Sequence, residues 1–263
     1  MSYCIVLIIA SHSYVYDSFI ALWREKIQYL KENSVVNNTF RFFFVFSDPS
    51  LHVDILCVDD CIYCKYEESL EPGIFLKTMS AIRYCEENFS YDYILRTNLS
   101  SFWNFPCLSF DSISIGTIFL QLLDRNHLYV NPRWKDFFLI IDDILPVDFA
   151  KDVFFFLDGA GFLLSREMVR LLLLPYVNKK ILLLPDDVAI TVLLYYQILH
   201  SNQSVEILEL SIGKKIISNN NIAIMRDSSV GFVRNKQDLV QDRPFDVLNF
   251  KHQLDFFYKK IDV

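Results

Sequence analysis

The chain has 263 residues, of which 52% are hydrophobic and 22% charged, and it contains 24 Phe and 14 Tyr but only 6 Gly and 8 Pro. This composition excludes a disordered or fibrous protein, because enough apolar surface is present to form a large core. The net charge of −7 argues against a nucleic-acid partner. We expect an acidic, soluble protein that folds as one domain.

The first 50 residues predict a strand, a helix and a second strand. Residues 5–10 form a continuous aliphatic run, which is typical of a strand buried on both faces. Apolar residues recur at helical spacing over 13–30, and residues 40–46 form a second buried strand. This order is typical of the beginning of a parallel α/β sheet.

The alternation continues along the chain. Further strands are predicted over 53–58 and 91–95, and two apolar runs flank the small residues 159–161. The predicted helices cover 74–88, 166–174 with Ser165 as its cap, and 186–199. The expected fold is therefore α/β, in three layers, with a mixed, mostly parallel central sheet.

The cysteines and the hydropathy pattern indicate a reducing compartment. Cys57, Cys61 and Cys64 lie close together, but no second CxxC and no His at finger spacing follow, so zinc is not expected. No run of about 20 apolar residues occurs, and no secretory leader is recognisable. We expect a cytoplasmic protein without a membrane span.

Three polar segments could carry chemistry, and each has a purely structural alternative. Asn98, Ser100 and Ser101 follow the strand 91–95, where open α/β sheets bind ligands, but they could equally form a turn. The small residues 159–161 permit either close approach to a ligand or a tight bend. Asp186 and Asp187 could supply a general base, or could simply stabilise the start of a helix.

Taken in order, these segments resemble the beta-1,3-galactosyltransferase and Fringe family of glycosyltransferases. Residues 70–104, LEPGIFLKTMSAIRYCEENFSYDYILRTNLSSFWN, are similar to its LTLKT and YDYVLKTDDDVFVN segments. DGAGFLLSR at 158–166 resembles its GGGYVLSR segment, and LPDDV at 184–188 resembles the segment that carries its catalytic acid. The three motifs span about half of the chain.

The resemblance implies a GT-A-type fold and an inverting transfer of a sugar from a nucleotide-sugar donor, expected to be UDP-linked, to a glycan hydroxyl. Residues 1–263 would form one glycosyltransferase domain, with a nucleotide-sugar-binding half at about 1–105 and an acceptor-binding and catalytic half at about 106–263. The missing membrane anchor makes the chain look like the soluble relatives of bacteria and large DNA viruses, so the expected location is the cytoplasm, that of the host if the chain is viral.

The resemblance also assigns roles to residues. Asp187 is the expected general base, with Asp186 as the second candidate. The expected donor-binding residues are Ser11, His12, Asp48, Lys77, Arg96, Asn98, Ser100 and Arg234. The expected acceptor-binding residues are Trp103, Trp134, Asp158, Gly159, Ala160 and Gly161.

One departure from the family concerns the metal. The family holds a divalent cation with a DxD motif, and Asn98, Leu99 and Ser100 stand at that position here. Neutral oxygens would hold Mn²⁺ or Mg²⁺ weakly, so we expect no metal site from them. Asp48 or Asp158 could restore one, and otherwise cations would stabilise the diphosphate; the candidates are Lys77, Arg96, Arg234, Lys236 and Arg243.

Two other functions compete with the transferase. A binding or scaffold protein that kept the fold and lost catalysis would explain the missing DxD acids, whereas the intact LPDDV segment argues against it. A hydrolase acting on nucleotide sugars would release free sugar without an acceptor.

Overall fold

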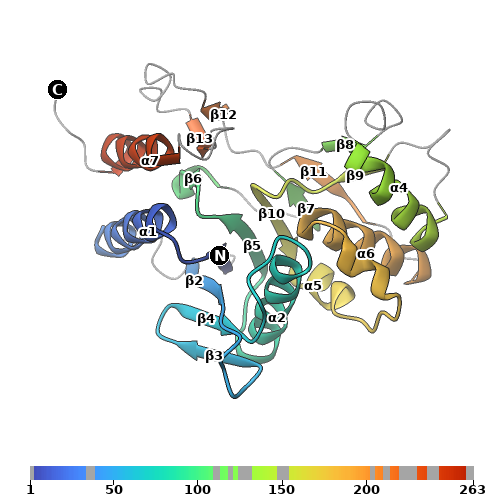
Figure 1. The fold of residues 1–263 in the computed structure, drawn as a ribbon. Coiled ribbons are helices and arrows are strands. Elements are labelled where there is room, and N and C mark those ends of the chain that lie inside the picture. Colours follow the sequence, from blue (N-terminus) through green and yellow to red (C-terminus); the bar gives the residue numbers. More distant parts are fainter. Residues whose placement is uncertain are drawn as a thin grey trace.

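The computed structural model describes residues 3–33, 39–108, 113–117, 121–123, 132–146, 154–201, 205–209, 214–218, 230–235 and 243–258. A central eight-stranded sheet dominates the fold, in the order β11-β7-β10-β5-β1-β2-β4-β3 (Figure 1). The first part of the chain forms β1 Cys4–Ile9, α1 Tyr14–Glu32, β2 Phe40–Ser47, β3 Ile55–Val58, β4 Cys61–Cys64, α2 Gly73–Asn88 and β5 Tyr93–Asn98.

The later elements extend this sheet and add smaller ones. They are β6 Ser101–Trp103, β7 Ile115–Thr117, β8 Gln121–Leu123, α4 Pro132–Ile144, β9 Phe154–Phe156, β10 Gly161–Ser165, α5 Arg166–Leu172, α6 Asp186–Ser201, β11 Ile207–Glu209, β12 Lys214–Ser218, β13 Val230–Asn235 and α7 Arg243–Tyr258. Two short 3₁₀ helices cover Phe105–Cys107 and Lys179–Leu183. A second sheet joins β12, β13 and β6, and a third pairs β8 with β9.

The sheet is mixed and mostly parallel, as the sequence predicts. β1 runs parallel to both β2 and β5, while β10 lies antiparallel between β5 and β7. Strands from both halves of the chain therefore share one sheet.

Alternate residues of β1 lie in two different cores. Leu7 belongs to the core beneath α2, α5 and α6, and Val6 belongs to the core beneath α1 and α7. Because side chains alternate across a strand, this burial on both sides confirms the three layers. Within the described residues, no helix has both the length and the apolar character needed to cross a bilayer.

Most predicted elements are confirmed, with shifts at their ends. Ser13 caps α1 by accepting from the Tyr16 amide, and Ser165 caps α5 by accepting from the Met168 amide. The predicted helix 166–174 ends at Leu172, and the predicted strand 91–95 lies at 93–98. The strand β4, which pairs with β2, has no counterpart in the sequence-based prediction.

Candidate active site

The strand order changes direction at β1. The chain passes from β1 to β2 on one side and later returns to β5 on the other. In open α/β sheets, ligands bind in the crevice outside the carboxyl ends of the strands at such a point. A cleft of about 230 Å³ lies there, lined by Ala10 and Ser11 after β1 and by Asn98 and Ser100 at the end of β5.

Three cationic side chains line this cleft, and each contacts a carboxylate. The Lys77 side chain is only 1% exposed, and its ammonium donates to the Ala10 carbonyl at 2.7 Å and to both Glu68 oxygens at 2.7 and 2.9 Å. Burial lowers the pKa of Lys77, and Glu68 opposes this shift. The other two pairs are Arg234 with Asp158 at 3.2 Å and Arg243 with Asp246 at 3.3 Å.

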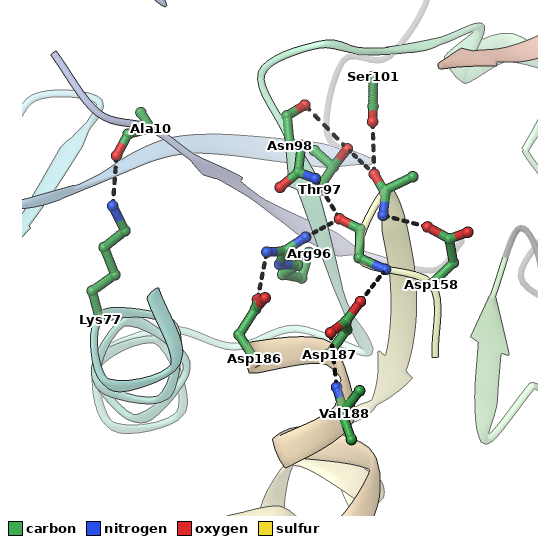
Figure 2. Close-up of polar contacts among 12 residues, drawn as sticks. Ala10, Lys77, Arg96, Thr97, Asn98, Ser101, Asp158, Asp186, Asp187 and Val188 are labelled. Atoms are coloured by element: carbon green, nitrogen blue, oxygen red, sulfur yellow. Dashed lines mark hydrogen bonds and ion pairs between the residues drawn. The ribbon is translucent and has the colours of Figure 1, made fainter. Parts of the chain in front are cut away.

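The loop between β9 and β10 is held by hydrogen bonds from β5 and β6. Asn98 donates its side-chain amide to the Gly159 carbonyl at 2.6 Å, and Arg96 donates to the same oxygen. The Thr97 and Ser101 hydroxyls both donate to the Ala160 carbonyl, at 3.1 and 2.8 Å (Figure 2). The loop is therefore fixed directly beside the cleft wall formed by Asn98.

Gly159 brings this loop into contact with the start of α6. Its amide donates to Asp187 Oδ2 at 3.1 Å. A Cβ atom on Gly159 would lie 2.7 Å from the same carboxylate oxygen, closer than van der Waals contact allows. Only glycine permits this approach, so the residue is required for the position of Asp187.

Asp186 and Asp187 occupy different electrostatic environments. Asp186 forms a buried ion pair with Arg96 at 2.5 Å, and the Arg96 side chain is 2% exposed. Burial, and then the negative charge of Asp186, raise the pKa of Asp187 to about 7, and the nearby Arg96 opposes the shift. Asp186 is held in an ion pair with Arg96, whereas Asp187 has a pKa near neutral pH, so the two adjacent carboxyls are suited to different roles.

The expected donor-binding residues separate into two groups. Five of them line the cleft: Ser11, Lys77, Asn98, Ser100 and Arg234. The other three do not. Arg96 is instead the partner of Asp186, His12 stacks on Phe46 and faces Asp17 at 3.3 Å, and the Asp48 carboxylate accepts from the backbone and hydroxyl of Ser50.

The expected acceptor-binding residues separate in the same way. Trp103 is fully buried, donates to the Thr97 hydroxyl at 2.8 Å and packs against Phe232, so no face of its ring is open to a sugar. We therefore do not assign it an acceptor contact. Trp134 belongs to α4, and its side chain lies outside the described part. Asp158, Gly159, Ala160 and Gly161 form the loop beside Asp187.

The residues at the position of the family's DxD motif do not fit a divalent cation. Leu99 is 4% exposed and its carbonyl accepts from the Trp23 indole. Asn98 and Ser100 leave only neutral oxygens, whereas hard cations prefer carboxylates. Among the described residues, no group of three or more His, Cys, Asp or Glu side chains is arranged to hold a metal ion.

Sequence reasoning missed two polar residues of the cleft, Glu68 and Tyr16. Glu68 lies in the loop before α2, where nothing local distinguishes it from its acidic neighbours. Its role depends on Lys77, which reaches it from the buried side of α2.

Comparison of the sequence with protein-family models, and with curated proteins, gives no match.

Proposed function

We propose that this protein is an inverting glycosyltransferase with a GT-A-like fold, which moves a sugar from a nucleotide-sugar donor to a glycan hydroxyl. One observation carries the proposal. A cleft with cationic walls lies at the point where the strand order reverses. Its wall residue Asn98 donates to the Gly159 carbonyl, and the amide of the same glycine donates to Asp187. The donor site and the base are thus separated by a single residue of the loop.

The pKa of Asp187 supports its proposed role as the general base. A carboxyl with a pKa of about 7 is ionised in a substantial fraction of molecules at neutral pH and still accepts a proton readily. The acceptor oxygen attacks the anomeric carbon and its proton passes to the Asp187 carboxylate. The bond between that carbon and the donor phosphate breaks, and its electron pair leaves with the diphosphate.

Arginine side chains are suited to stabilise the leaving diphosphate. Arg234 and Arg243 line the cleft, and an arginine presents several N–H donors to phosphate oxygens. Asn98 and Ser100 add neutral polar groups at the end of β5. This assignment routes no step through a metal ion, in agreement with the poor ligand set at residues 98–100.

The variant Asp187→Asn tests the proposal. It keeps the size of the side chain and an acceptor for the Gly159 amide, but it cannot accept the proton. We expect kcat for sugar transfer to fall about 10²- to 10⁴-fold while donor affinity changes little. Asp142→Asn, which removes an exposed carboxylate of α4, is the matched control.

A thermal-shift panel of nucleotides and nucleotide sugars, run with Mn²⁺ and with EDTA, identifies the donor class. A ligand at a hundredfold excess over its Kd should add about 2.7 kcal/mol of stability. A shift in melting temperature that persists in EDTA supports a diphosphate site formed by cationic side chains. The absence of a shift with every nucleotide would refute the transferase and favour the binding or scaffold alternative. Release of free sugar without an acceptor would identify a hydrolase instead.

A further inference from the structure

A second hollow lies on the other side of α2 from the cleft. We define the α5–α6 groove as the hollow of about 230 Å³ between α2, α5 and the segment 173–182. Its walls are mostly apolar, with Phe75, Met79, Leu172, Tyr176, Leu182 and Leu193 among the lining residues. The segment leads from α5 into α6, which packs beside α2 (Figure 1).

Large apolar side chains protrude beside this groove. Val177 is 91% exposed, the highest value among the exposed large hydrophobic residues of the described part, and Leu174 is 47% exposed. Both residues also line the groove. An apolar hollow with protruding aliphatic side chains at its rim is a feature of surfaces that meet an apolar partner.

The rim of the groove is positively charged in an acidic protein. Arg83 and Lys179 line it and are exposed, and neither is paired with a carboxylate among the described residues. The neighbouring Lys180 contacts Asp143 at 2.9 Å, so we do not count it as a free charge. The net charge of the chain is −7, so an anionic partner would repel the rest of the surface. This repulsion would favour the orientation in which the groove faces that partner.

From this combination we infer that the α5–α6 groove docks on the surface of a bilayer that contains anionic phospholipids. Leu174 and Val177 would enter the acyl layer, and Arg83 and Lys179 would contact the lipid phosphates. A second copy of the chain fits less well, because a two-fold contact would bring the cations of both copies together.

The inference is independent of the proposed catalytic function, and its test uses no donor or acceptor. The purified full chain is mixed with phosphatidylcholine vesicles, with or without phosphatidylglycerol, and the vesicles are floated through a density gradient. We expect flotation with the anionic vesicles, little with phosphatidylcholine alone, and a decrease as salt is added. A wild-type chain that does not float, or floats equally with both vesicle types, would overturn the inference.

Two variants assign the contact to the groove. Val177→Asp should lower the partition coefficient at least about tenfold, because it replaces an inserted aliphatic side chain with a charge. Val53→Asp is the matched control, since Val53 is an exposed valine that does not line the groove. Equal losses in both variants would contradict the proposed site.

The double variant R83Q/K179Q tests the charge. It should weaken binding to anionic vesicles about fivefold for each cation removed, and it should reduce the salt dependence.

Circular dichroism checks that every variant is folded. Light scattering of the wild type and of Val177→Asp gives the oligomeric state. If the wild type is a dimer and Val177→Asp is a monomer that floats as well as the wild type, the groove binds a second copy of the chain. That result would overturn the inference that the groove binds a bilayer.

Discussion

Removing the charge of Asp187 should make the protein more stable at alkaline pH while it abolishes the proposed base. Burial and the charge of Asp186 raise the pKa of this carboxyl from 3.8 to about 7 in the folded state. The folded state therefore holds the proton more tightly than the unfolded state. The contribution of Asp187 to stability is most favourable below about pH 4, and it is lost as pH rises towards about 7.

The size of the expected change in stability follows from the shift in the pKa of Asp187. Three pKa units correspond to about 4 kcal/mol in total, of which about 2–3 kcal/mol falls between pH 5 and pH 8. In Asp187→Asn the introduced amide does not titrate, so this loss is absent. Its single oxygen can accept from the Gly159 amide or the Val188 amide but not from both, which costs about 1 kcal/mol at every pH.

Urea denaturation of the wild type and of Asp187→Asn at pH 5 and pH 8 measures the effect. We expect the difference in free energy of unfolding between the two proteins to move by about 2–3 kcal/mol in favour of the variant as pH rises. The exposed Asp142→Asn serves as the control for the removal of one negative charge. A difference that is the same at both pH values would refute the assignment of a raised pKa to Asp187.

Three further substitutions test the packing of the site and of the core. Gly159→Ala should lower the free energy of unfolding, measured by denaturation, by about 1–3 kcal/mol, because its Cβ would displace the Asp187 carboxylate. The same displacement should lower kcat without changing the nucleotide-induced thermal shift. Arg96→Met should destabilise the protein by about 3–5 kcal/mol, because it leaves Asp186 buried without its cation; an unchanged melting temperature would contradict this. Lys26→Met should be more favourable, relative to the wild type, at pH 7 than near pH 10, as measured by the two melting temperatures. Burial lowers the pKa of Lys26, so the wild type loses stability as pH falls below about 10, whereas the lost hydrogen bond to the Trp103 carbonyl costs stability at both pH values.

The strands β1 and β2 could be predicted because their signals are local. Residues 5–10 and 40–46 are continuous apolar runs, and Ser13 has the side chain of a helix cap. The sequence gives no comparable signal for the insertion of β10 between β5 and β7, or for the pairing of β13 with β6. Those pairings join strands far apart in the chain, and no pattern within either strand specifies its neighbour.

The candidate site shows the same limit. The segments around Gly159 and Asp187 could each be singled out from the sequence, but their contact joins residues 28 positions apart. Trp103 illustrates the opposite error. A tryptophan after a polar strand end suits either a sugar contact or a core position, and only the tertiary structure places it in the core, against Phe232.

The ion pairs of the cleft indicate how its cations divide their roles. The Lys77 ammonium is already bonded to the Ala10 carbonyl and to both oxygens of Glu68, so it joins α2 to the end of β1 and has little capacity left for a ligand. Arg234 and Arg243 each contact a carboxylate through one guanidinium nitrogen, and a guanidinium has five N–H donors. Under the proposed function, an incoming diphosphate could therefore bond to the two arginines without breaking their existing pairs. Lys77 would then maintain the shape of the cleft, whereas Arg234 and Arg243 would recognise the anion.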